Sequence, residues 1–266
     1  MERRGSGVDH DMTYCVGMLV DEGLAMIADT RTNAGVDNIS SYRKLHLIQQ
    51  PGDRVLAIAT AGNLSVTQTA LAMVAQGITL PGHEVAETLH TAPSLFRAAQ
   101  LLGHAVSSVR KDLSPSLQAD NLNVNATMLL GGQIEGGPMS LYLIYGQGNF
   151  IECGPDTPFL QVGELKYGKP ILDRALRSDT PLAEAVKLGL ISSDATIRSN
   201  VAVGAPFDLV LMKRNALSAD AYRIEEDDAY FEDLGRRWSQ ALSDAHQAMP
   251  MPPFLKPARA SIKAVT

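Results

Sequence analysis

The chain contains little cysteine and no long apolar run. Its 266 residues include two cysteines, Cys15 and Cys153, which form neither a disulfide framework nor a CxxC zinc pair. No apolar run reaches the length of about 18 residues that a membrane-spanning helix needs, so we expect no membrane contact. The first twelve residues lack the apolar segment of a secretory signal. Together these absences predict a cytoplasmic protein.

Basic residues are in the minority. Lys and Arg number 23 against 29 Asp and Glu, which gives a net charge of −6 and an isoelectric point near 5.5. Nucleic-acid binding needs a basic face, so nucleic acid is not an expected partner. Hydrophobic residues make up 45% of the chain, which is ordinary for a globular protein and argues against a wholly disordered one.

The common catalytic and cofactor motifs are also missing. The chain has no GxSxG nucleophile elbow, no phosphate-binding P-loop and no HExxH zinc motif. His83, Glu84 and His90 have the wrong spacing for two ligands on one helical face, so we expect neither a metal nor a cofactor. Cys15 lies among apolar residues and is expected to be a buried structural thiol.

Strands and helices are expected in blocks along the chain. The blocks are four strands, two helices, three strands, two helices and one strand. The expected strands are 13–20, 24–28, 44–48, 54–61, 124–130, 141–145, 159–162 and 207–213, and the expected helices of these blocks are 64–76, 84–111, 169–177 and 182–198. Segments 29–41 and 131–137 are expected to be loops. This order favours an α+β fold, and two sheets between helix layers would satisfy it.

The chain divides into three parts. Residues 1–12 are polar and look detachable, so they are either a leader or a misassigned start. Residues 13–214 hold the blocks of strands and helices. Residues 215–266 are expected to contribute a helix at 227–246 and an extended, Pro-rich basic arm.

Thr13 directly follows Met12 and is a candidate nucleophile. If the chain begins at Thr13, this residue carries both a hydroxyl and a free α-amine, whose pKa is ordinarily about 7.7–8. Such an amine can act as the base that activates the hydroxyl. Three origins of the first twelve residues compete: a start codon that really lies at Met12, a cleaved propeptide, or a retained extension that blocks the amine. The polar leader and the in-frame Met12 favour the first.

Asp29 and Lys44 are expected to meet Thr13 at one end of a sheet. Asp29 ends the second expected strand and Lys44 opens the third. A hairpin with equal arms returns the end of its second strand to the start of its first. A buried ammonium there would lower the pKa of a neighbouring amine and hydroxyl, and a carboxylate would keep the lysine charged. Taken singly these residues mean little, because strand ends are commonly charged.

Several motifs resemble one known family. The run TYCVGMLVDEGLAMIADTRTNAG starts at Thr13, and RKL and ATAGN follow at 43–45 and 59–63. VGELKYGKP occupies 162–170, and RSN with VGAPFD occupies 198–208. This pattern is similar to proteasome-type threonine peptidases, which are N-terminal-nucleophile (Ntn) hydrolases. Within them it resembles the bacterial Anbu, or ancestral β-subunit, group. The resemblance implies a four-layer αββα sandwich.

The resemblance assigns roles to four residues. Thr13 matches the family's catalytic threonine, and Asp29 matches the aspartate of its A-D-[ST]-R motif. Lys44 matches the lysine that opens the third strand, although its spacing from Thr13 is one residue shorter than in proteasome β-subunits. Leu45 cannot replace this lysine, so the gap falls in the loop 37–42. Gly62 matches the glycine whose backbone N–H forms the oxyanion hole.

Three further residues are candidate auxiliaries. Glu164 follows Gly163, which matches the glycine of a Gly-Ser pair in the family, so Glu164 stands where the family has serine. Ser199 and Asn200 lie where the family has an Asp-x-x-Ser pattern. These departures leave two interpretations of Glu164 and Ser199 open, which are auxiliary hydrogen bonding at the site and ordinary loop capping.

The resemblance implies an oligomeric, proteasome-like endopeptidase that hydrolyses peptide bonds of unfolded proteins or peptides. It implies self-association into a ring or a helical oligomer. The chain has no ATP-binding motif, so any unfoldase would be a separate protein and substrate is delivered or diffuses in. Two alternatives remain at this point: a non-catalytic ring subunit with a permanently blocked Thr13, and an Ntn amidohydrolase that acts on small amides.

Overall fold

The computed structural model describes residues 13–33, 39–119 and 123–255. The expected leader at 1–12 and the end of the basic arm at 256–266 lie outside the described residues. So do residues 34–38, which include the first two positions of the loop 37–42 that was expected to absorb the one-residue gap.

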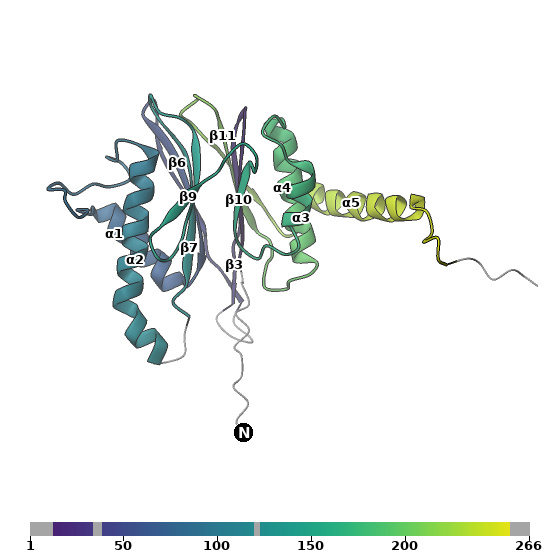
Figure 1. Cartoon of the computed structure of the whole chain (residues 1–266), viewed down its shortest axis with the longest axis horizontal. Coiled ribbons are helices and arrows are strands. Elements are labelled where there is room, and N and C mark those ends of the chain that lie inside the picture. The colour runs from purple at the N-terminus through teal and green to yellow at the C-terminus, as the bar shows by residue number, and fades with distance from the viewer. Residues whose placement is uncertain (1–12, 34–38, 120–122, 256–266) are drawn as a thin grey trace, which may run out of the picture.

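Four layers, α–β–β–α, make up the described part of the chain (Figure 1). Two five-stranded antiparallel sheets face each other, and a helix layer covers the outer face of each. The first sheet has the order β10 (Phe159–Gly163), β1 (Tyr14–Val20), β2 (Gly23–Asp29), β11 (Phe207–Lys213) and β12 (Asp220–Ile224). The second has the order β5 (Leu45–Gln50), β6 (Arg54–Gly62), β7 (Ala126–Ile134), β8 (Ser140–Ile144) and β9 (Phe150–Glu152). The expected α+β sandwich is therefore confirmed.

The helices divide between the two outer faces. The layer over the second sheet holds α1 (Leu64–Gln76) and α2 (Leu95–Ala119). The layer over the first sheet holds α3 (Lys169–Ala175), α4 (Leu182–Ile197) and the root of α5 (Ala229–Ala248). Helix α1 begins after Asn63, whose side chain accepts N–H bonds from Ser65 and Val66 and so caps the first turn. Asp228 caps α5 in the same way through the amide of Phe231.

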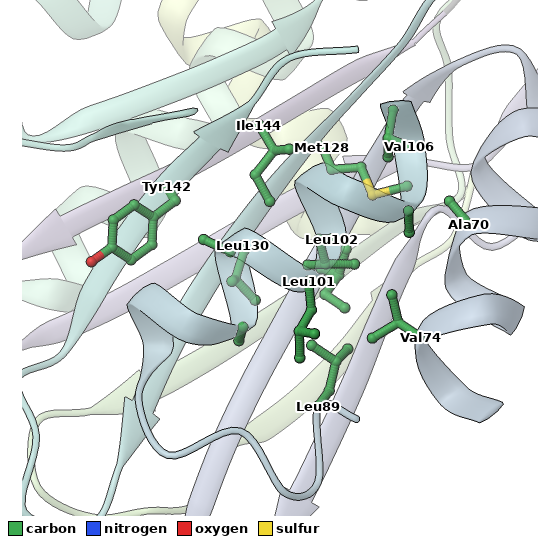
Figure 2. Packing of buried hydrophobic residues seen from close by; sticks show 14 of the residues in the cluster. Ala70, Val74, Leu89, Leu101, Leu102, Val106, Met128, Leu130, Tyr142 and Ile144 are labelled. Carbon is green, nitrogen blue, oxygen red and sulfur yellow. The ribbon is translucent and has the colours of Figure 1, made fainter. Parts of the chain in front are cut away.

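Apolar side chains fill each of the three spaces between the layers. Figure 2 shows the cluster under α1 and α2, which includes Val74, Leu101 and Leu102 from the helices and Met128 from β7. A second cluster lies between the two sheets, and a third joins the first sheet to α4 and α5. Strands β1 and β2 are buried almost throughout, which explains why they read as continuous apolar runs.

Helix α2 departs from its expected boundaries. It begins at Leu95, not at Glu84, and continues to Ala119. The preceding segment forms an isolated bridge between Ile78 and Glu87 and a turn at Thr88–Thr91. Pro93 explains the late start, because the residue before a proline is disfavoured in helical conformation.

Two of the four glycines expected at a flexible hairpin tip lie instead inside a strand, while Gly136 and Gly137 do lie at the turn that follows it. Gly131 and Gly132 belong to β7, which runs on to Ile134. A side chain at Gly131 would lie 2.5 Å from Leu24 Cδ2 in the facing sheet, so the close approach of the sheets requires a glycine there. Composition suggested a loop where tertiary packing selected a strand.

Four short strands were also missed. The expected loop 29–41 contains the two-stranded ribbon of β3 (Arg31–Asn33) and β4 (Ile39–Ser41). Strand β9 pairs with β8, and β12 pairs with β11 at the edge of the first sheet. Strands β3, β4 and β9 are three residues long each, and β12 is largely exposed. None of the four therefore shows a long apolar pattern in the sequence.

Candidate active site

The ends of several strands meet at one corner of the sandwich. Tyr14 opens β1 opposite Gly163, which ends β10, and Asp29 ends β2 opposite Phe207. In the other sheet, Thr60 near the end of β6 donates its N–H to the carbonyl of Lys44 at 3.0 Å. The Cys15 thiol lies 3.7 Å from the Thr60 carbonyl and connects the sheets there.

Thr13 is held at this corner through its main chain. It is 7% exposed, and its carbonyl accepts the N–H of Glu164 at 2.7 Å. Gly163 has φ +87°, and a side chain there would lie 2.0 Å from the Thr13 carbonyl oxygen. The chain therefore needs a glycine at 163 to bring β10 this close to Thr13.

Asp29 and Lys44 form a buried ion pair beside Thr13. Lys44 Nζ lies 2.8 Å from Asp29 Oδ1, and the two side chains are 6% and 0% exposed. The same ammonium donates to the carbonyl of Arg31 at 2.6 Å. Asp29 Oδ1 also accepts the backbone N–H of Tyr14 at 2.9 Å, so the carboxylate joins the lysine to the residue that follows Thr13. Leu45 points into the core between the sheets.

Burial dominates the electrostatics of this pair. Desolvation raises the pKa of Asp29 to about 6, while the Lys44 ammonium and the backbone N–H groups of Tyr14 and Gly204 act in the opposite direction. The ion pair and the hydrogen bonds thus offset part of the cost of burying the carboxylate. Burial also raises the pKa of the Cys15 thiol far above its ordinary value, which fits a structural thiol.

Gly62 lies at the exposed end of β6, opposite Ala126 of β7. Its φ is +96°, and a side chain there would lie 2.3 Å from the carbonyl oxygen of Asn125. Helix α1 follows directly, and the N-terminus of a helix favours negative charge. The positive φ and the close contact require a glycine at this position, which is where the family resemblance places the oxyanion hole.

The three candidate auxiliary residues differ in their surroundings. Glu164 is buried, and its Oε2 accepts the side-chain amide of Asn200 at 3.1 Å. Its Oε1 accepts the N–H of Lys166 at 2.9 Å, which is a capping contact. Ser199 is exposed, and its amide donates to the carbonyl of Thr196 at the end of α4. The structure thus brings Glu164 and Asn200 together near Thr13 and leaves the Ser199 side chain at the surface.

Sequence reasoning missed other residues at this corner. The Arg31 guanidinium lies against Gly204 and donates to the carbonyl of Val201 at 3.2 Å, while the Arg31 main chain holds Lys44. The Tyr14 phenol is fully buried and hydrogen-bonded. Arg31 lies within the ADTR run and Tyr14 follows the nucleophile, so adjacency to the motifs was the available signal.

The described residues were expected to hold no metal site and no membrane-spanning helix. Over the residues that the structure describes, no group of three or more His, Cys, Asp and Glu is placed to hold a metal ion. Within the same ranges, every helix is too short or too polar to cross a bilayer.

Comparison with known proteins places this geometry among relatives. No family model matches the chain. Proteasome subunit beta 2 of Pyrobaculum aerophilum is 28% identical over 211 residues, which cover 79% of this chain and 93% of that protein. The solved structure of Anbu (ancestral β-subunit) from Yersinia bercovieri is 44% identical with a TM-score of 0.81, and the match covers 90% of this chain and 99% of that one.

Two further solved structures agree. An Anbu (Gly-1) mutant from Hyphomicrobium sp. strain MC1 is 45% identical with a TM-score of 0.82, covering 90% of this chain and 98% of that one. The helical assembly of the Anbu complex from Pseudomonas aeruginosa is 45% identical with a TM-score of 0.81, covering 91% and 98% respectively.

Proposed function

Because the chain belongs to the Anbu family of proteasome-type Ntn proteins, we propose that it is a threonine-type endopeptidase with Thr13 as its nucleophile. The buried Lys44–Asp29 pair beside Thr13 is the observation that carries the proposal. Replacing a buried ion pair with apolar residues is often neutral or stabilising, so fold stability alone does not account for one here. A charge held next to an amine and a hydroxyl has a chemical use.

The chemistry proceeds in two stages. Thr13 Oγ attacks the scissile carbonyl, and the α-amine of Thr13 accepts the hydroxyl proton and returns it to the leaving amine. The C–N bond breaks and an ester joins the acyl group to Thr13. Water, deprotonated by the same amine, then attacks the ester and releases the acid, which regenerates the hydroxyl.

The surrounding residues have electrostatic roles in both stages. The backbone N–H of Gly62 stabilises each tetrahedral oxyanion. Lys44 keeps the amine neutral at physiological pH by lowering its pKa, and the ion pair with Asp29 holds the Lys44 ammonium in place. Glu164 and Asn200 fix the main chain of Thr13 from the other side, and Ser199 is a third auxiliary of lesser weight because its side chain is exposed.

This mechanism requires Thr13 to be the first residue of the active chain. An amide to Met12 would remove the base, so residues 1–12 must be absent from the start or cleaved. The active unit then comprises 13–214 together with a C-terminal helix and arm within 215–266.

The proposal includes self-association into a ring or a helical oligomer, and the solved structure of the Pseudomonas aeruginosa relative is a helical assembly. Its support in this chain is α5, whose root packs Phe231 and Gly235 against the body while the later turns are exposed. Figure 1 shows this helix extending away from the sandwich. Leu242, 52% exposed, and Met249, 63% exposed, lie on the projecting part. A second copy of the chain would cover them.

Hydrolysis of a peptide library by the native oligomer tests the proposal. Thr13→Ala should abolish cleavage and leave assembly intact, because one hydroxyl and one methyl are lost. Thr13→Ser should keep some activity, since nucleophile and amine both survive. Full activity of Thr13→Ala would refute the mechanism. Cleavage of small amides without peptides would favour the amidohydrolase, and an unprocessed Thr13 would favour the non-catalytic subunit.

A further inference from the structure

The residue after the proposed nucleophile has an unusual environment. Tyr14 is 0% exposed, and its phenol donates to Ser192 Oγ on α4 at 2.6 Å. The amide of Gln161, on β10, donates to the same phenol oxygen at 3.3 Å. Burial raises the pKa of this phenol to about 12, so it stays a neutral donor. The hydroxyl therefore ties β1 to both a helix and a neighbouring strand.

These hydrogen bonds of Tyr14 lie at the start of β1, where the strand has few pairing contacts. Pairing of β1 with β2 begins at Cys15, so Tyr14 pairs with Gly163 alone. After processing, Tyr14 would be the second residue of the chain, and chain ends fray unless tertiary contacts hold them. The backbone N–H of Tyr14 donates to Asp29, and the carbonyl of Thr13 accepts the N–H of Glu164. Those two contacts set where the amine and hydroxyl of Thr13 lie.

Ser192 is itself held in place. Its carbonyl accepts the Thr196 hydroxyl at 2.8 Å, and its own hydroxyl lies so near Gly168 that a side chain at 168 would come within 2.3 Å of it. Helix α4 therefore presents a fixed acceptor to the Tyr14 phenol.

We propose that Tyr14 is a positioning residue, whose phenol, held by Ser192 and Gln161, fixes the Thr13 amine and hydroxyl relative to Lys44. This inference rests on the proposed function. It predicts that loss of the phenol oxygen slows the chemical step and leaves binding of the peptide unchanged, because the phenol lies in the core away from any substrate.

The test uses a peptide epoxyketone, which adds to a hydroxyl and a neighbouring amine together, with the processed oligomer. Tyr14→Phe should lower the maximal inactivation rate about ten- to a hundredfold, the usual effect of a misplacement near 1 Å. The half-saturating concentration should stay within about twofold, as for loss of an interaction made only in the transition state. Tyr142→Phe is the matched control, since it removes the hydroxyl of a tyrosine that is 5% exposed and belongs to the apolar cluster in the other half of the sandwich.

A second readout separates positioning from stability. Charged groups at this corner are Lys44, Asp29, Glu164 and Arg31. Retreat of the Thr13 amine from the Lys44 ammonium raises the pKa of the amine. The acid limb of the rate profile should therefore move to higher pH in Tyr14→Phe and not in Tyr142→Phe. Loss of fold stability alone would leave that limb in place.

Ser192→Ala keeps the test decisive should Tyr14→Phe fold poorly. Ser192→Ala should reproduce the slower rate and the shifted acid limb. The double variant should be little worse than either single variant, because both substitutions remove the same hydrogen bond between Tyr14 and Ser192. Wild-type rates and an unmoved limb in Tyr14→Phe or in Ser192→Ala would overturn the inference. Failure of the unmodified protein to react at Thr13 would instead overturn the proposed function, and the inference with it.

Discussion

At the scale of single residues, the account depends first on Lys44. Lys44→Ala should lower the rate about a hundredfold or more, the size of effect expected for lost acid–base support. Lys44→Arg should not rescue activity, because the planar guanidinium does not fit a site built around one ammonium. Both rates are measured by epoxyketone labelling of Thr13.

Leu45→Ala is the control for this substitution. Leu45 lies in the core between the sheets, so its truncation should cost about 2–5 kcal/mol of unfolding free energy and retain the chemistry in the folded fraction. Activity in Lys44→Ala together with inactivity in a folded Leu45→Ala would show that Lys44 was matched wrongly to the family's lysine.

The raised pKa of Asp29 makes a prediction about pH. As pH falls through about 6, Asp29 takes up a proton and Lys44 loses its counter-ion. Protonation of the amine already gives a slope of one in log rate against pH, so the slope should steepen towards two below about 6. Because the folded pKa lies above the unfolded value of 3.8, this proton binds the folded state more tightly. This group therefore does not lower the melting temperature between pH 6 and 4.

Labelling rates from pH 5 to 8 and thermal melts from pH 4 to 8 check both statements. A slope that stays at one down to pH 5 would contradict the requirement for ionised Asp29. If the labelling rate and the melting temperature fell together as the pH is lowered, unfolding would explain the loss of labelling.

Gly163 sets the distance between β10 and Thr13. Gly163→Ala places a methyl group against the Thr13 carbonyl and forces a positive φ on alanine, which alone costs about 1–2 kcal/mol. We expect lower stability and strongly reduced labelling of Thr13. Gly136→Ala is the control. Gly136 also has a positive φ, but nothing lies within 4 Å of the added methyl group, so this variant should retain full labelling of Thr13. Equal labelling of the two variants in their folded fractions would refute the close contact.

At the scale of elements, sequence predicted long strands and missed short ones. Strands β1, β2 and β6 are buried on both faces, so they appear as apolar runs that need no tertiary information. The exposed β12 carries no such pattern, and the glycines of β7 resemble a loop until the facing sheet is known. Local signals therefore define the inner strands, and packing defines the rest.

The candidate site shows the same division. The convergence of Thr13, Asp29 and Lys44 followed from hairpin geometry and family resemblance, since all three lie at strand ends near each other in sequence. Contacts from distant segments did not follow, because the hydrogen bond between Tyr14 and Ser192 spans 178 positions. Such pairs become visible only once α4 is placed over β1.

At the scale of the whole molecule, the projecting part of α5 predicts assembly. Deleting residues 250–266 should lower the oligomer mass or its salt tolerance and leave the sandwich folded, because the site lies entirely within 13–200. Leu242→Glu should weaken assembly further, since it places a charge on the exposed apolar stripe that Leu242 and Met249 form on the projecting part of α5. Gln247→Glu adds the same charge about 140° around the helix and should assemble normally.

Sedimentation across a range of salt concentrations checks these variants. An unchanged profile for the deletion would indicate a tail without a role in assembly. Equal weakening by Leu242→Glu and Gln247→Glu would show that net charge, and not the apolar stripe, controls association.

The proposed mechanism requires Thr13 to be a processed, reactive N-terminal nucleophile. Intact mass of the native oligomer before and after treatment with a peptide epoxyketone tests it most directly. We predict a chain that begins at Thr13 and gains one adduct, mapped by fragmentation to the Thr13 residue. A chain that retains residues 1–12, or one that begins at Thr13 and gains no adduct there, would contradict the account.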